Sequence, residues 1–267
     1  MAKEQLDSIE IKIELCRMLK ELDEYLGGHG IQYSIMSGTL LGAVRHGGFI
    51  PWDDDIDIAV LRKDYDRLIE ILRKNKRIGE ELEISGYEVD KTDMPFLKVY
   101  NKSIAVKDNL ANDPSELWID IFPFDNVPDN FILKRIHFIK CFIFRKIFWS
   151  QVGAKVEKNK LTRIVYKILC KLPFKVIVRK YQKFINRGQK KKTKLVRILT
   201  FPTPPKVYGY NRKWYTQLKK YKFDELELPG AADYDGYLSV KYGNYMTLPP
   251  DDKRKVHPVS RIKLIEV

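Results

Sequence analysis

The chain of 267 residues is long enough for one well-buried domain with an elaboration or for two small domains, and its apolar fraction of 44% excludes wholesale disorder. Its three cysteines, Cys16, Cys141 and Cys170, are odd in number and far apart, which excludes a disulfide framework and a CxxC metal knuckle and favours a reducing compartment. Since the sequence shows no signal peptide and no apolar run of membrane-spanning length, we expect a cytoplasmic protein, soluble or peripheral to a membrane.

The net charge of +14 is concentrated in one segment. Residues 134–197 hold 21 Lys and Arg and a single acidic residue, Glu157, whereas the rest of the chain holds 28 basic and 34 acidic residues. A slightly acidic body therefore carries one strongly basic segment. Segments of this kind meet anionic partners, which are phospholipid, nucleic acid or a polyanionic substrate.

The first 125 residues predict helices that alternate with strands. Apolar residues at steps of three and four predict a helix over residues 4–26, which Gly27, Gly28 and Gly30 end. The elements expected after it, in chain order, are a strand at 31–36, a helix at 37–45, an acidic strand at 53–60, a helix at 64–75 and strands near 82–89, 95–100 and 117–122. This alternation indicates an α/β or α+β domain.

The basic region has a different pattern. Isoleucines at helical spacing with interleaved cations predict a helix over residues 131–150, and residues 161–172 repeat the pattern. Pro173 and Gly188 divide the region into two or three helices. A proline-rich bridge at 201–205 then leads to a tyrosine-rich C-terminal region.

The sharpest chemical signal is the run Asp53, Asp54, Asp55, Ile56 and Asp57. Four carboxylates in five positions repel one another and lower the strand propensity, so folding alone does not favour them. On a strand Asp55 and Asp57 point the same way, about 7 Å apart, and can converge on one hard divalent cation that offsets their repulsion. The alternative is an exposed acidic turn before a strand, but the strict apolar alternation after Asp55 favours the metal site.

A second signal lies 17 residues upstream of Asp55, where a strand leads through Met36, Ser37 and Gly38 into Thr39 at a helix start. Such a junction offers backbone N–H groups and the positive helix end to a phosphate, so Ser37, Gly38 and Thr39 are the candidate donor-binding residues. A Ser-Gly pair followed by an Asp-x-Asp pair, each fed by a short strand, resembles the nucleotidyltransferase superfamily.

The resemblance narrows to one family. The segments YSIMSGTLLGAVRHGGFIPWDDDID at 33–57, WIDIFP at 118–123 and the region 234–254 with YGNYM and LPP resemble the LicD family of phosphotransferases, most closely over 30–65. Bacterial phosphocholine transferases belong to this family, and animal fukutin-type ribitol-phosphate transferases are related to it. The resemblance implies an α+β fold with a nucleotidyltransferase-like mixed sheet flanked by helices. We expect a catalytic core in 1–130, a basic helical insertion in 131–200 and a C-terminal part in 201–267 that completes the catalytic domain and acceptor pocket.

The resemblance also implies the chemistry. It is the metal-dependent transfer of a substituted phosphate, such as phosphocholine, from a CDP-linked donor to a sugar hydroxyl of a cell-surface glycan or its lipid-linked precursor. Asp55 and Asp57 match the metal-binding pair and Asp120 matches the third carboxylate, with Mg²⁺ or Mn²⁺ as the ion. Asp120 either completes the metal shell or takes the acceptor proton. The alternative is that Asp120 caps a loop at a strand end.

Further candidates surround these motifs. Arg45 is placed to steady a phosphate or leaving group, or is a solvated cation at a helix end. His46 is a candidate general acid or a surface residue. Lys98, a cation in an apolar strand, is expected to contact a phosphate. In the C-terminal region, Tyr242 and Tyr245 are expected to be packing residues that shape the acceptor pocket. His257 is a further candidate for the site.

The basic segment 131–197 allows three interpretations. The segment contacts an anionic membrane surface at the inner leaflet, or it forms a surface that binds nucleic acid, or its helices pack on the core while their lysines are solvated. We favour the membrane, because a lipid-linked acceptor suits it and no nucleic-acid motif is present. Two rival functions stay open: a true nucleotidyltransferase that moves NMP from an NTP, and a non-catalytic, membrane-associated scaffold.

Overall fold

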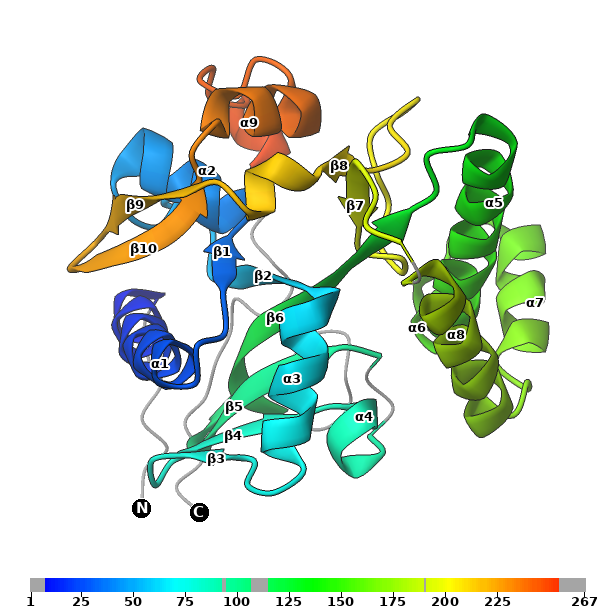
Figure 1. Ribbon diagram of the computed structural model, residues 1–267, viewed down its shortest axis with the longest axis horizontal. Helices are drawn as coiled ribbons and strands as arrows, with labels where there is room; N and C mark the ends of the chain where they lie inside the picture. The colour runs from blue at the N-terminus through cyan, green and yellow to red at the C-terminus, as the bar shows by residue number, and fades with distance from the viewer. Residues whose placement is uncertain (1–7, 93–94, 107–114, 190, 255–267) are drawn as a thin grey trace. The chain divides into compact units, whose positions relative to one another are not determined.

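The computed structural model describes residues 8–92, 95–106, 115–189 and 191–254. The chain forms two compact units, one from Met1–Phe122 together with Lys213–Val267 and one from Pro123–Arg212 (Figure 1). No helix in the described ranges is both long and apolar enough to cross a membrane. The division into core, insertion and C-terminal part at residues 130 and 200 stays a prediction.

The first unit is built on a mixed sheet. Its strands, in spatial order, are β3 (Arg77–Ile78), β4 (Leu82–Ser85), β5 (Leu97–Val106), β6 (Ser115–Val127), β2 (Asp57–Leu61), β1 (Tyr33–Ile35), β10 (Leu226–Ala231) and β9 (Leu218–Phe223). β1 pairs parallel with β10 and antiparallel with β2, and β5 pairs antiparallel with β6. The expected α+β class, with a mixed sheet flanked by helices, is confirmed.

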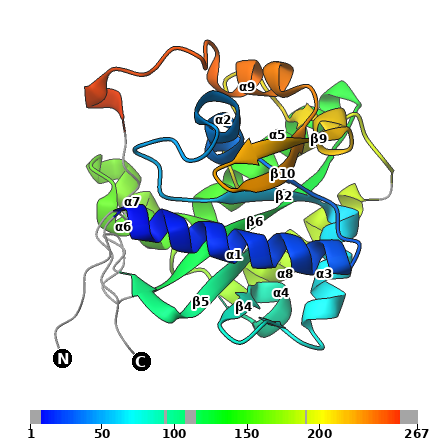
Figure 2. The same cartoon turned by 90° about the vertical axis from the view of Figure 1, so that its left-hand side faces the viewer.

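The helix α1 (Ser8–Gly28) crosses one face of this sheet (Figure 2). It packs against both β10 and β3, which lie far apart in the strand order. Its apolar stripe is fully buried at Leu15, Leu19 and Leu22. Burying a leucine side chain contributes roughly 1.5–3 kcal/mol, so this stripe is what holds the helix on the sheet. The helix expected over 4–26 is therefore confirmed for its described residues.

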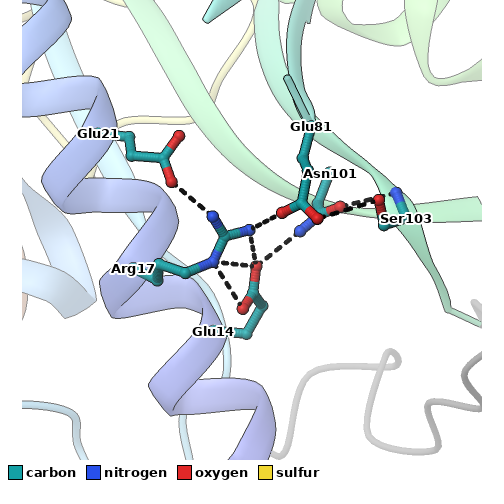
Figure 3. A network of polar contacts seen from close by, with 6 residues as sticks. All are labelled: Glu14, Arg17, Glu21, Glu81, Asn101 and Ser103. Carbon is teal, nitrogen blue, oxygen red and sulfur yellow. Dashed lines mark hydrogen bonds and ion pairs between the residues drawn. The ribbon is translucent and has the colours of Figure 1, made fainter. Parts of the chain in front are cut away.

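A polar network fixes the position of α1 along the sheet (Figure 3). Arg17 lies within 2.6 Å of Glu14 on the same helix and within 2.6 Å of Glu81, which lies between β3 and β4. The fully buried Asn101 of β5 donates from Nδ2 to Glu14 Oε1 at 2.6 Å. Because Arg17 is partly exposed, each of its ion pairs contributes about 1 kcal/mol or less. The buried amide of Asn101 sets the geometry, since an unpaired Asn101 would be costly.

Four further helices surround the sheet: α2 (Ser37–His46), α3 (Arg62–Leu72), α4 (Tyr87–Asp90) and α9 (Tyr234–Tyr242). Short 3-10 turns lie at Arg212–Tyr215 and Asp251–Lys253. α2 packs against β2, β9 and α9, and both figures of the whole chain place α2 beside α9 (Figures 1 and 2). α3 packs against β2. The two helices α2 and α9 thus meet next to the start of β2.

Some expected strands differ from the observed ones. The strand expected over 53–60 begins only at Asp57, because residues 53–56 have no regular structure and their carboxylates repel one another. The strand expected near 82–89 ends at Ser85, and α4 follows Gly86. The hairpin of β9 and β10 was not expected, since the lysines of β9 hide the period-two pattern.

The second unit is mostly helical. Its helices are α5 (Phe131–Phe148), α6 (Ser150–Val156), α7 (Lys160–Leu169) and α8 (Phe174–Gly188). Its strand β7 (Leu195–Arg197) pairs antiparallel with the end of β6, and β8 (Tyr210–Asn211) pairs antiparallel with β7. The described part of the basic region thus forms four helices, where the sequence indicated two or three. The additional break lies at Trp149, between α5 and α6.

The core of the second unit is small and aromatic. Cys141, Tyr181, Ile185 and Leu199 are buried together, with Phe144, Phe148 and Phe184 packed against them. His137 of α5 is also buried, with its ring centroid 4.9 Å from that of Phe184 and its Nδ1 3.6 Å from Cys141 Sγ. Burial, with the charges of Arg197 and Lys140, lowers the pKa of His137 to about 4.

We expect His137 to make the second unit sensitive to acid. The unfolded state takes up a proton near pH 6.5 while the folded state stays neutral down to about pH 4, so stability falls as the pH drops through this window. At pH 5 the loss is about 2 kcal/mol. Hydrogen exchange of α5 and α8 peptides, corrected for the intrinsic rate at each pH, measures it. His137→Phe should remove this pH dependence, and an unchanged profile in that variant would contradict the assignment.

Candidate active site

The junction between β1 and α2 is tied to the start of β2 and to α9. The backbone N–H of Met36 donates to Asp57 O at 3.2 Å, and the N–H of Asp57 donates to Thr39 Oγ1 at 2.9 Å. The N–H of Ser37 donates to Tyr237 Oη of α9 at 3.1 Å. Ser37 has a φ of 50°, in the left-handed region, which is costly for a serine. This strain is offset by the surrounding bonds and is typical of functional turns.

Gly38 allows the acidic run to approach the start of α2. A Cβ atom at this position would lie 2.5 Å from Asp53 Oδ2. Any other residue therefore displaces the Asp53 carboxylate, which is the movable partner. The glycine of the motif is required by this contact and not by its own φ.

Carboxylates from two strands and the preceding loop meet beside this junction. The N–H of Asp120 on β6 donates to Ile56 O at 3.0 Å, which brings β6 against the acidic run. Asp57 interacts electrostatically with Asp55 and Asp120, and Asp53 is hydrogen-bonded to Asp55. The structure thus brings together the three carboxylates Asp55, Asp57 and Asp120 that the sequence singled out.

Burial and the neighbouring carboxylates disfavour the ionisation of Asp53, Asp57 and Asp120. Burial, followed by the charges of Asp55 and Asp54, raises the pKa of Asp53 to about 8. Burial and the charges of Asp55 and Asp120 raise the pKa of Asp57 well above its ordinary value. Burial also raises the pKa of Asp120, although Lys98 opposes this shift. A cation bound among them would reverse these shifts, since it favours the charged forms.

Two lysines offset part of this charge. Lys98 of β5, opposite Asp120 in register, lies with Nζ 3.0 Å from Asp120 Oδ1 and 4.1 Å from the Trp118 ring centroid. Lys241 at the end of α9 interacts with Asp57, and burial lowers its pKa. Lys98 was expected to contact a phosphate, but the structure shows it paired with a carboxylate. Lys241 was missed, because only the fold reveals that α9 ends beside β2.

A cavity of about 290 Å³ opens next to the cluster. Asp53 and Gly38 line it on the cluster side, and Arg45, Trp52 and Tyr242 are among its other walls. Arg45 Nη1 donates to Tyr245 O at 2.7 Å, and burial lowers the Arg45 pKa. The cavity places an arginine within the same pocket as the acidic run, as a site for a charged phosphate ester requires.

The remaining sequence candidates differ in their placement. His46 is exposed, and its ring makes an edge contact with Trp52 at 6.3 Å between centroids. Tyr245 lines the cavity together with Tyr242, as expected of packing residues. His257 lies outside the described residues.

The donor set suits a hard divalent cation by its chemistry. Asp55, Asp57 and Asp120 offer only carboxylate oxygens, which Mg²⁺ and Mn²⁺ prefer. Lys241 and Lys98 lower the pKa of Asp57 and Asp120, but burial and the neighbouring carboxylates keep both pKa values above the ordinary one. Among the described residues, however, no three acidic, histidine or cysteine side chains already form a ready metal-binding arrangement. The fit therefore rests on the chemistry and proximity of the carboxylates, and the metal stays a prediction.

Comparison with known proteins identifies this region. Residues 30–150 match the model described as LicD/FKTN/FKRP, nucleotidyltransferase domain. The chain is 25% identical over 242 residues to a lipopolysaccharide cholinephosphotransferase, LicD, of Haemophilus influenzae, a match that covers 88% of this chain and 89% of that protein. This chain carries a LicD-family domain.

Two other relatives match shorter parts of the chain. An uncharacterised protein of Rickettsia prowazekii is 45% identical over 67 residues, which is 25% of each protein. The human ribitol 5-phosphate transferase FKRP is 29% identical over 114 residues, 40% of this chain and 20% of its own length. The LicD-family match contains the Ser37–Thr39 junction, the acidic run, Lys98 and Asp120, whereas Tyr237 and Lys241 lie beyond it.

We expect Asp57→Asn to stabilise the metal-free LicD-family domain. The folded state holds Asp57 with a raised pKa, so ionisation costs stability as the pH rises above about 4, and the amide removes this cost. The gain should be present at pH 7.5 in EDTA and should disappear near pH 4. Thermal unfolding measures it, with the exposed Asp252→Asn as the matched control. A destabilised Asp57→Asn variant would contradict the repulsion.

Proposed function

We propose that this protein is a phosphotransferase that moves a substituted phosphate from a CDP-linked donor to a sugar hydroxyl. The observation that carries the proposal is the cluster of Asp55, Asp57 and Asp120 beside the Ser37–Thr39 junction and the Arg45 cavity. The relatives support it, because cholinephosphate and ribitol 5-phosphate, the groups in their names, are both phosphate esters of small alcohols. The acceptor is a cell-surface glycan or its lipid-linked precursor.

The three carboxylates are the proposed ligands of Mg²⁺ or Mn²⁺. Such an ion, when bound, supplies charge neutralisation for the donor phosphates and polarises the phosphoryl oxygens. Lys98 holds the Asp120 carboxylate in place through the 3.0 Å ion pair. Lys241 limits the repulsion at Asp57. The two lysines thus keep the carboxylates together before any ion binds.

The start of α2 binds the donor phosphates in this proposal. The N–H of Ser37 is already taken by Tyr237, so the free amides of this turn begin at Gly38. These amides and the positive end of the ten-residue helix favour a phosphate. Arg45 on the last turn of the same helix reaches the cavity, where it steadies the phosphate or the leaving group.

In the chemical step the acceptor hydroxyl oxygen attacks the phosphorus. A new P–O bond to the sugar forms, the P–O bond to CMP breaks, and the hydroxyl proton passes to a carboxylate of the cluster. Asp120 either completes the metal shell or takes this proton, and in the second role the raised pKa that burial gives it increases its basicity. Most of the acceleration comes from positioning and charge stabilisation. His46 remains a candidate general acid.

Release of CMP from a panel of donors tests the proposal. The panel holds CDP-choline, CDP-ethanolamine, CDP-glycerol and CDP-ribitol, each with Mg²⁺ or EDTA and with a glycan acceptor, and CTP serves as the nucleotidyl-transfer control. We expect metal-dependent CMP release from one donor. Pyrophosphate release from CTP would instead establish a true nucleotidyltransferase. Asp57→Asn should lower turnover by at least ~1000-fold, since about 4 kcal/mol of charge stabilisation is lost.

We expect Gly38→Ala to impair turnover while the fold persists. The added Cβ displaces the Asp53 carboxylate, which is a side-chain end and moves easily, but it also narrows the entrance to the phosphate-binding amides. The loss of turnover should be at least tenfold, with the thermal midpoint within a few degrees of the parent. Gly27→Ala is the matched control, because a Cβ there meets nothing within 4 Å. Equal turnover in both variants would refute the role of the Gly38–Asp53 approach.

A further inference from the structure

The helix α7 of the second unit turns its apolar side to solvent. Its residues at steps of three and four are Leu161, Ile164, Val165 and Ile168, which are 76%, 54%, 52% and 62% exposed. Tyr166, on another side of the helix, is buried. A surface helix of a globular protein normally buries its apolar stripe. In α7 the stripe is on the outside, so folding of the unit does not account for it.

The helix α5 also exposes an apolar stripe to solvent. Its buried positions are His137 and Cys141, which face the aromatic core. An exposed apolar stripe runs along another side of the helix, at Ile132, Ile136, Ile139 and Ile143. Lys146 Nζ of α5 donates to Tyr166 Oη of α7 at 2.8 Å, so the two helices are neighbours. We call the two exposed stripes together the α5–α7 face.

Cations and aromatic rings alternate along α5. The Arg135 guanidinium lies 4.8 Å from the Phe131 ring centroid, and Arg145 lies 5.3 Å from that of Phe142. Both phenylalanines are exposed. The surrounding segment of residues 134–197 offers only one acidic residue for 21 cations, so most of these charges have no acidic neighbour in the segment. The face is therefore apolar along its stripes and strongly positive around them.

We propose that the α5–α7 face docks into the headgroup region of a bilayer that contains anionic phospholipid. An amphipathic surface with isoleucine and phenylalanine on the apolar side and lysine and arginine around it matches the two layers of a bilayer interface. Each cation near an anionic leaflet adds a favourable electrostatic contribution to binding. The described helices do not span a membrane, so the contact is peripheral.

Charge argues for lipid over the other occupants. A second copy would bring the same positive segment against itself, so the two faces would repel. Nucleic acid would satisfy the cations but leave the exposed isoleucines in water, since phosphate contacts dominate such binding. A bilayer with anionic headgroups satisfies both the cations and the apolar stripes.

Vesicle sedimentation tests the proposal with the full chain. The probes are vesicles of pure phosphatidylcholine and vesicles with 30% phosphatidylglycerol, at low and at high salt. We expect the protein to sediment with the anionic vesicles only and to be released by high salt, because the ionic part is screened. Ile164→Ser/Ile168→Ser should weaken binding at least tenfold, and Lys167→Glu/Lys171→Glu should weaken it at low salt.

Matched variants on the first unit serve as controls. Ile9 and Ile13 of α1 are 65% and 64% exposed, so Ile9→Ser/Ile13→Ser removes equally exposed side chains outside the face. Lys63→Glu/Lys74→Glu reverses two exposed charges of α3 and its end. Both should bind as the parent does. The proposal would be overturned if the protein did not bind anionic vesicles, or if the control variants lost as much binding as the variants of the face. It would also be overturned by a dimer in solution that Ile164→Ser/Ile168→Ser dissociates, without any vesicle binding.

The test is independent of the proposed reaction. Vesicle binding needs neither donor nor acceptor, and its variants leave Asp55, Asp57 and Asp120 unchanged. With a soluble acceptor sugar, Ile164→Ser/Ile168→Ser should release CMP at the parent rate. A protein that binds vesicles but releases no CMP would leave the docking face supported and the phosphotransferase refuted.

Discussion

Repulsion among partly buried carboxylates is the constraint on which the active region depends. Asp53, Asp55, Asp57 and Asp120 come from a loop and two strands, and burial together with their mutual repulsion raises the pKa of Asp53, Asp57 and Asp120 above its ordinary value. Folding has to overcome this cost with other contacts. The Asp120–Ile56 backbone bond, the Thr39–Asp57 bond and the Lys98 ion pair are the contacts that oppose the repulsion directly. These contacts hold the carboxylates close together despite their repulsion.

The sheet explains how distant segments meet at this point. β1 lies between β2 and β10, so the start of α2, the acidic run and α9 are brought together by the pairing of three short strands. Tyr237 and Lys241 come from the C-terminal part of the chain and complete the surroundings of Ser37 and Asp57. The first unit therefore needs residues from both sides of the basic segment.

Much of this could be predicted from the sequence, because the acidic run and the glycine junction carry their chemistry in neighbouring residues. Apolar periodicity predicted most helices and left α/β and α+β open, and the mixed sheet of the α+β class followed from the family resemblance. The start of β2 at Asp57 could not be predicted, because the apolar alternation extends the expected strand upstream to residue 53, whereas repulsion among the carboxylates opposes a strand there. The β9–β10 hairpin was hidden by exposed lysines, and Lys241 has no local signal, because its partner Asp57 lies far away in the sequence. The inverted stripes of α5 and α7 are likewise invisible in the sequence, where an exposed and a buried apolar face look the same.

The strand β6 has a consequence for how such a chain can be changed. It carries Asp120 in the first unit and continues past Phe122 into the second, where the backbone of Asp125 lies opposite that of Arg197 in the register with β7. The unit Pro123–Arg212 as a whole therefore cannot be removed without cutting β6. Excising Pro123–Arg212 would cut β6 shortly after Asp120 and remove the part of the strand that pairs with β7. The helices α5–α8, in contrast, lie between Val127 of β6 and Leu195 of β7, which are register partners, so a change confined to these helices leaves the pairing of β6 with β5 intact.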